Sequence, residues 1–225
     1  MNAQANVTKA KRNARKTAEV SAPVVETVVT VDRAAAAQSA ILDAIKARVA
    51  SAPNDNFRKN MSAELNQFSG ANAKRAIELC IELEIDFESL ARSIAITEAR
   101  NADYVAIYAL QKVRKAVFAL AQKSRAVFDG YSHSIIHNIV SLQALTNKTA
   151  QMSICKSIEF SELEQVQAIK RYKECTPSTA STQASSTRQM LRFLNICTVV
   201  KNKKDDSIAL TESKAAQAVQ SIFSA

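Results

Sequence analysis

Apolar residues recur every three or four positions through most of the chain, the spacing that places them on one face of an α-helix. The pattern is clearest within residues 97–125, where Leu110, Val113, Val117 and Leu120 form an apolar seam. With the polar breaks between segments, it predicts a series of helices over 33–50, 56–68, 71–85, 86–96, 97–125 and 132–145.

Two of these helices carry further detail. In 33–50, the residues Ile41, Leu42, Ile45 and Val49 share one face. In 97–125, we expect the seam to pack in the core while Lys112, Lys115 and Lys123 occupy a solvated side. A coiled-coil dimer through the seam is the alternative.

The first 32 residues lack this pattern. Residues 1–16 hold five basic side chains and no acidic one: Lys9, Lys11, Arg12, Arg15 and Lys16. The Val-rich residues 24–31 could form a strand, but nothing obvious in the sequence pairs with it. We therefore expect 1–32 to be a basic, poorly ordered tail that acts as a nucleic-acid-binding arm, with an organellar address signal as the alternative.

A different order of elements begins at residue 157. Apolar spacing predicts a helix over 157–174 that ends at Cys175-Thr176-Pro177, because proline cannot continue a helix. The Ser/Thr-rich residues 178–186 are either a flexible linker or a short second helix with Ala180 packed inward. Beyond them the pattern predicts a helix, two strands joined by the turn 202–206, and a closing helix: 186–195, 196–201, 207–211 and 212–223.

This order resembles the winged helix-turn-helix, a family of DNA-binding modules, over residues 157–223. The resemblance implies that 186–195 lies in the major groove, and the apolar pattern turns Met190, Leu191 and Leu194 inward. The side chains that would then face base edges are Thr187, Arg188, Gln189 and Arg192. The hairpin would be the wing, with Lys201, Lys203 and Lys204 near phosphates. An ordinary amphipathic helix is the alternative for 186–195.

The expected fold is therefore mainly α, with a helical N-terminal domain and a small winged-helix-like domain that contains one β-hairpin. We place the tail at 1–32, the helical domain at 33–147 and the winged-helix-like domain at 148–225, with the boundary near Lys148, where polar residues interrupt the apolar pattern. No family is recognised for 33–147.

The charge of the chain points to a polyanionic partner. Its net charge is +9, with five positive charges in residues 1–16. Residues 170–204 hold eight Lys or Arg against one Glu, a net +7. The rest of the chain is slightly acidic, so the charge gathers at two ends rather than serving solubility evenly. No apolar run is long enough for a membrane span.

Catalytic and cofactor chemistry find little support in the sequence. Two glycines cannot supply a phosphate-binding P-loop or a dinucleotide fingerprint. The four cysteines form no C-x-x-C pair, and a disulfide framework needs denser cysteines and a secreted context, so we expect reduced thiols. His133 and His137 stand one helical turn apart and could share Zn²⁺, but no third ligand is evident, so we interpret them as ordinary histidines. We expect no enzyme, no metal and no cofactor.

We therefore expect a non-enzymatic DNA-binding protein, with RNA as a second target, acting in the cytoplasm or nucleoid, or in a host cytoplasm or virion if it is viral. The helical domain would serve self-association, such as a homodimer, or binding of a protein partner. The alternative function is a helical structural or adaptor protein, for instance a viral or assembly component, whose basic ends touch nucleic acid without reading its sequence.

Overall fold

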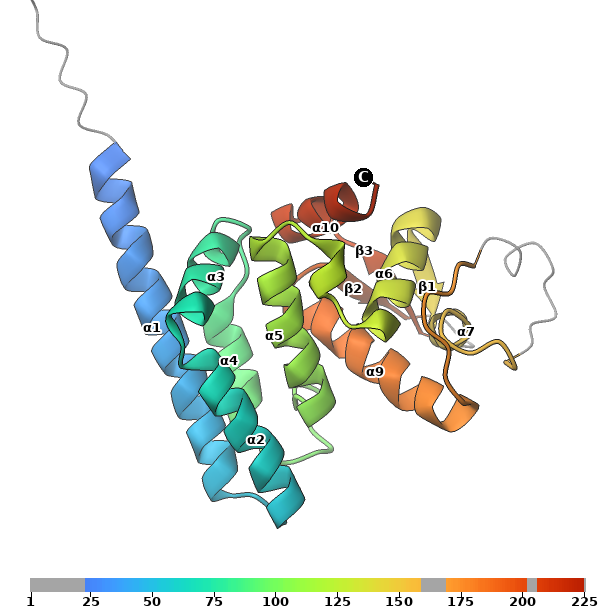
Figure 1. Ribbon diagram of the computed structural model, residues 1–225, viewed down its shortest axis with the longest axis horizontal. Coiled ribbons are helices and arrows are strands. Elements are labelled where there is room, and N and C mark those ends of the chain that lie inside the picture. Colours follow the sequence, from blue (N-terminus) through green and yellow to red (C-terminus); the bar gives the residue numbers. More distant parts are fainter. Residues whose placement is uncertain (1–22, 159–168, 202–205, 225) are drawn as a thin grey trace, which may run out of the picture.

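The computed structural model describes residues 23–158, 169–201 and 206–224, with the backbone alone for 23–32. The described part is mainly helical with a small three-stranded antiparallel sheet, which confirms the predicted fold class. Figure 1 shows the N-terminal helices side by side at one end of the molecule, and α9 with the sheet at the other.

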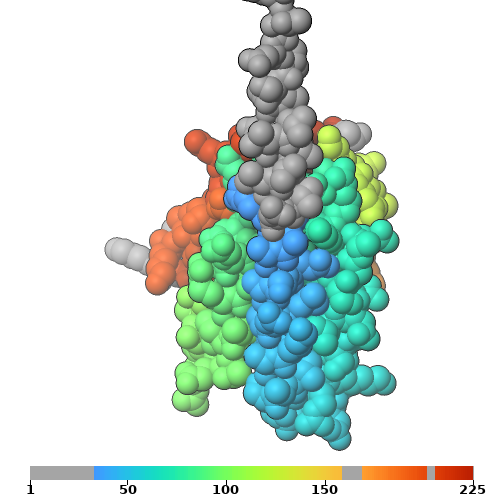
Figure 2. Space-filling view, turned by 90° about the vertical axis from the view of Figure 1, so that its left-hand side faces the viewer, coloured from blue at the N-terminus to red at the C-terminus, as the bar shows by residue number. Residues whose placement is uncertain are grey.

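Four helices form the first half: α1 (Pro23–Ala50), α2 (Asp55–Phe68), α3 (Ala71–Ile81) and α4 (Phe87–Ala95). α1 packs against the other three. Figure 2 shows α1 as a central column between α2 and α3 on one side and α4 with its following loop on the other. Ile41 and Ile45 are fully buried on the predicted face of α1. The side chains of Asn54 and Asp86 cap α2 and α4 by accepting a backbone N–H three residues on.

Two predictions in this half are wrong. Residues 23–32, which were expected within a poorly ordered tail, are helical, and 24–31 do not form a strand, since α1 already begins at Pro23, a position where proline loses no helical hydrogen bond. α3 ends at Ile81 instead of 85, because Glu84 adopts a left-handed φ of 62°. The N–H of Ile85 then turns back to the carbonyl of Cys80, which closes the helix.

The strongest predicted helix is also shorter than expected, since α5 spans Ile107–Ala121 rather than 97–125. Turns replace the predicted start of this helix. In these turns the Asn101 side chain accepts the N–H of Asp103, and such a local hydrogen bond competes with helix formation. Lys123, with φ 49°, follows its end. The seam itself is buried in the core of its own chain, as predicted.

The second half combines helices with the sheet. Its elements are η1 (Arg125–Val127), α6 (Gly130–Leu142), β1 (Ala144–Thr146), α7 (Asn147–Met152), α9 (Pro177–Phe193), β2 (Cys197–Val200), β3 (Ser207–Leu210) and α10 (Lys214–Ser224). The predicted hairpin and closing helix are confirmed as β2, β3 and α10. The sheet order is β1-β3-β2.

Strand β1 was not predicted, because the helix expected over 132–145 included part of it. α6 stops at Leu142, since Gln143 adopts a left-handed φ of 64°. The chain then runs antiparallel to β3, with Leu145 opposite Ile208, and both side chains are buried. Pairing with β3, which is distant in sequence, therefore determines that this segment is a strand, and no local pattern in the sequence indicates it.

The largest correction concerns residues 169–195. The predicted helix over 157–174 lies partly outside the described residues, and its described part from 169 onward is not helical. Pro177 begins a helix instead of ending one, and α9 runs without a turn through 178–186, expected to be a linker or a short separate helix, into the helix predicted over 186–195. The hydroxyl groups of Ser186 and Thr187 donate to carbonyls within the preceding turn, so these buried groups are satisfied inside the helix.

The two halves share one hydrophobic cluster, which includes Ile41 and Ile94 from the first half and Leu191 and Val219 from the second. The sheet also joins β1, which precedes Lys148, to β3, which follows it. The domain boundary near Lys148 stays a prediction, and any separation there would have to break this strand pairing.

Arg48 in the last turn of α1 fixes the path of the chain between α4 and α5. The residue is 2% exposed. Its Nη1 donates to the carbonyls of Ile94 at 3.0 Å and Val105 at 3.2 Å, and its Nη2 to the hydroxyl of Tyr104 at 2.9 Å. Its Cζ lies 4.6 Å from the ring centre of Tyr104 and 5.1 Å from that of Phe57. The cation thus satisfies a carbonyl at the end of α4 and holds the loop 96–106 in place.

Replacing Arg48 with Met should strongly destabilise the fold. The change leaves two buried carbonyls without these donors, at about 1–3 kcal/mol each, so we expect a loss of about 3–5 kcal/mol in the free energy of unfolding. Urea denaturation measures it. Lys46→Met is the matched control, because Lys46 lies on the same helix, is 60% exposed and pairs with Asp43, so its loss should stay below about 1 kcal/mol. Equal losses in the two variants would contradict this role of Arg48.

Candidate nucleic-acid interface

The outer face of α9 presents hydroxyl groups first and arginines after them. Ser178, Ser181, Ser185, Arg188 and Arg192 follow one another at spacings of 3, 4, 3 and 4, so they share one side of the helix. The serines are exposed, and the arginines are half-buried. Hydroxyl and guanidinium groups are the donors that proteins commonly direct at phosphate oxygens.

The opposite face of α9 packs into the core. Met190, Leu191 and Leu194 are fully buried, as the sequence predicts. Thr187, expected to face a base edge, is also fully buried. Its Oγ1 donates to the carbonyl of Gln183 and lies 3.1 Å from Oγ of Ser132 on α6. Thr187 therefore joins α9 to α6, and its predicted outward orientation is wrong.

The other predicted base readers contact the protein itself. Nη2 of Arg188 donates to the carbonyl of Asp206 at 3.0 Å, next to β3. Oε1 of Gln189 accepts the N–H of Ala106 at 3.3 Å. Nη2 of Arg192 donates to the carbonyl of Ala102 at 2.8 Å and lies 3.4 Å from a carboxylate oxygen of Asp103. These side chains bridge α9 to the hairpin on one side and to the loop 96–106 on the other.

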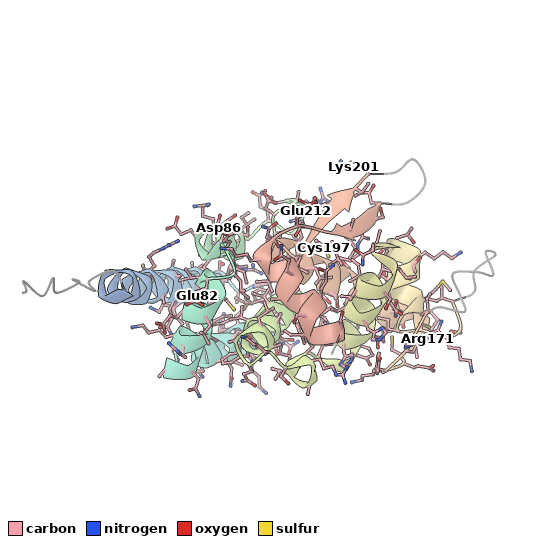
Figure 3. All side chains as sticks on the ribbon, turned by 90° about the horizontal axis from the view of Figure 1, so that it is seen from above. Glu82, Asp86, Arg171, Cys197, Lys201 and Glu212 are labelled. Carbon is pink, nitrogen blue, oxygen red and sulfur yellow. The ribbon has the colours of Figure 1, made fainter. Side chains whose placement is uncertain are left out.

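The predicted phosphate contacts lie mostly beyond the described chain. Lys201 is exposed directly after β2, and Figure 3 shows it at the end of the hairpin, clear of the helices. The predicted contacts that fall outside the described residues are Lys203 and Lys204 and, in the tail, Lys9, Lys11, Arg12, Arg15 and Lys16.

A groove of about 260 Å³ lies between α5, α6 and α9, and the sequence did not single it out. It is lined by Tyr108, Gln111, Lys112, Lys115, Asp129, Tyr131, Lys173 and Gln183. One local signal exists, since Tyr108, Gln111 and Lys115 follow a helical spacing on α5. The remaining lining comes from three other segments, and only the folded chain brings these together.

Lys112 forms the floor of this groove rather than part of a solvated side. It is 5% exposed, and its Nζ lies 2.9 Å from Oδ1 of Asp129 and 3.0 Å from Oγ of Ser132. Burial lowers the pKa of Lys112; Asp129 partly offsets this, while Lys115 and Lys173 lower the pKa further. Burial acts to raise the pKa of Asp129, but the charge of Lys112 and bonds from Ser132 outweigh it and hold that pKa below its ordinary value.

The two histidines of α6 flank one tyrosine. The ring centre of Tyr172 lies 4.4 Å from that of His133 and 5.2 Å from that of His137. Asn138 and Ser134 of the same helix bind the backbone of residues 170–173, which holds this tyrosine in place. Among the described residues, no group of three potential ligands is arranged to hold a metal. The histidines therefore pack against an aromatic side chain.

Comparison with protein-family models, with curated proteins and with solved structures finds no match for this chain. No described helix combines the length and apolar character needed to cross a membrane.

The histidines should make the protein less stable in mild acid. Burial is the main cause that lowers the pKa of His133, followed by repulsion from Arg125 and His137. Burial also lowers the pKa of His137, followed by repulsion from Lys170 and Arg125. The folded state then binds protons more weakly than the unfolded state, so stability should fall as the pH drops below about 6.5. The urea midpoint at pH 7.5 and pH 5.5 measures this, and His133→Gln with His137→Gln should reduce the difference. An unchanged difference would contradict it.

The buried pair of Lys112 and Asp129 should behave as a unit. Asp129→Asn keeps an acceptor at the start of α6 but leaves a buried ammonium without its counter-charge, which should cost about 3–5 kcal/mol. Adding Lys112→Met removes that charge and should restore a large part of the loss. Urea denaturation of the single and double variants gives the coupling energy. The idea fails if the double variant is no more stable than Asp129→Asn alone.

Proposed function

We propose that the protein is a non-enzymatic nucleic-acid-binding protein that uses its C-terminal half and basic tail, with DNA as the main target. The main observation that supports this proposal is the uneven charge of the two halves. Residues 33–106 hold 9 Lys or Arg against 10 Asp or Glu, a net −1, whereas residues 107–225 hold 16 against 8, a net +8. Segregation of this kind favours a polyanion on one side of the molecule.

The arrangement of elements supports a module similar to a winged helix. Among the described elements, α7, α9 and the hairpin of β2 and β3 come in this order along the chain, and α7 and β2 both contact α9. The hairpin carries Lys201 at its end, next to further lysines in the sequence. A helix with an adjacent cationic hairpin suits the backbone of a duplex. The near-neutral first half is left for self-association or for a protein partner.

One observation favours the second candidate function, a structural or adaptor protein that contacts nucleic acid without sequence readout. Arg188, Gln189 and Arg192 already bond to the protein. Side chains engaged in this way have fewer donors left for base edges, whereas the exposed serines of α9 suit phosphates, which carry no sequence information.

Removing the hairpin charges should weaken binding to every duplex. We expect the triple change of Lys201, Lys203 and Lys204 to Ala to lower the slope of log affinity against log salt by up to about 2.7, at roughly 0.9 per phosphate contact. Fluorescence anisotropy with a labelled duplex measures the slope between 50 and 200 mM salt. The matched control changes Lys46, Lys59 and Arg100, three exposed cations of the first half, to Ala. Equal slopes in the two triple variants would count against the hairpin as the contact.

The same assay separates the two candidate functions. Selection from random DNA first provides a preferred duplex, and a scrambled duplex serves as its partner. If Arg188 reads a base, Arg188→Ala should weaken the preferred site by about 1–3 kcal/mol more than the scrambled one. If both weaken equally, or selection yields no preferred site, the adaptor function without readout takes precedence.

A further inference from the structure

The groove between α5, α6 and α9 gathers more positive than negative charge. Three ammonium groups, those of Lys112, Lys115 and Lys173, line it with one carboxylate, that of Asp129. Oδ1 of Asp129 accepts from Lys112 and from the backbone of Tyr131 and Ser132, and its Oδ2 is buried with no hydrogen-bond partner among the described residues, so the carboxylate is paired with Lys112 and is not open to solvent. Lys115 takes part in none of the ion pairs of the described chain, so the outer part of the groove keeps a net charge of about +2 for an anion.

Lys173 is held in position at this groove. Its Nζ lies 4.5 Å from the ring centre of Tyr131, within range of a cation–π contact. Its backbone N–H donates to Oγ of Ser134. Gly130 leaves room for it, since a Cβ at that position would lie 2.9 Å from Cδ of Lys173. The backbone of Lys173 is thus held by Ser134, and its side chain passes over Gly130 to the ring of Tyr131.

An exposed aromatic ring completes the groove. Tyr108 is 50% exposed although it stands on a helix that is otherwise packed in the core. It lies on the same side of α5 as Gln111 and Lys115, and the amides of Gln111 and Gln183 add donors and acceptors to the lining. Exposed aromatic side chains beside cations are the combination with which proteins hold single strands, since bases stack on the rings while ammonium groups meet phosphates.

We infer that this groove binds a single strand of nucleic acid, with backbone phosphate between Lys115 and Lys173 and an unpaired base stacked on Tyr108. The inference rests on the proposed nucleic-acid binding and goes further, because it names the form of the nucleic acid. A duplex keeps its bases stacked inside, so it can use the ammonium groups of the groove but not the tyrosine ring. The groove therefore discriminates between single strands and duplexes through Tyr108.

The test compares full-length variants on fluorescein-labelled oligothymidylate, oligouridylate and a duplex of the same length. Tyr108→Ala should weaken binding of the single strands by roughly 10-fold and leave the duplex unchanged, whereas Tyr108→Phe should keep near-normal affinity. Tyr172→Ala is the matched control, since Tyr172 is 52% exposed but stacks on histidines outside the groove lining. Lys115→Ala with Lys173→Ala should lower the salt slope for single strands by up to about 1.4, at roughly 0.7 per contact.

The outcomes separate this inference from the proposed function. The groove inference is overturned if Tyr108→Ala leaves single-strand binding intact, or if it weakens duplex and single strand alike. It is also overturned if Tyr172→Ala weakens single-strand binding as much as Tyr108→Ala does. A lower urea midpoint in both Tyr108→Ala and Tyr108→Phe, which would indicate a general loss of folding, overturns it as well. If the wild-type protein binds the duplex and the groove variants do not change binding, only the groove inference is overturned. Wild-type protein that binds neither nucleic acid overturns both.

Discussion

The burial of the Arg48 guanidinium is the interaction on which the arrangement of the two halves depends. Its donors satisfy the carbonyls of Ile94 and Val105 from inside the first half. The loop 96–106 offers other backbone groups outward, and Gln189 and Arg192 of α9 bind these at Ala106 and Ala102. One loop is thus held from both sides, by Arg48 of α1 and by Gln189 and Arg192 of α9, beside the hydrophobic cluster that the two halves share.

The local elements that the sequence predicts correctly are those whose burial follows a helical period. The faces of α1, α5 and α10 belong to this group, whereas the hairpin of β2 and β3 was predicted from β-prone residues on either side of a turn. The errors at helix ends have a common cause, because Glu84, Lys123 and Gln143 take left-handed backbone conformations that the chain, with two glycines, gives to ordinary residues. Such residues carry no sequence signal comparable to glycine.

The interpretation of α9 fails for a different physical reason. A run of serine and threonine reads as a linker because these residues compete with helical hydrogen bonds in isolated peptides. In the folded chain, Ala180 and Ala184 pack fully into the core, and Ser186 and Thr187 return their hydroxyl bonds to the helix itself. Tertiary burial thus overrides local preference. The groove escaped prediction because its lining comes from four segments, and only the spacing of Tyr108, Gln111 and Lys115 could have suggested part of it.

The contacts that hold α9 in place also limit which of its side chains are free to contact bases. A helix that reads bases needs several long polar side chains free to reach base edges. In α9 the long side chains Arg188, Gln189 and Arg192 instead join the helix to its neighbours, and the exposed remainder is mainly short hydroxyl groups. Short hydroxyl groups reach only a backbone that approaches closely, and backbone contacts orient a nucleic acid without reading it. In the nucleic-acid binding that we propose, the geometry of α9 would therefore favour affinity through charge and shape, and discrimination between nucleic acids would fall to features outside the helix, such as an exposed aromatic ring beside cations.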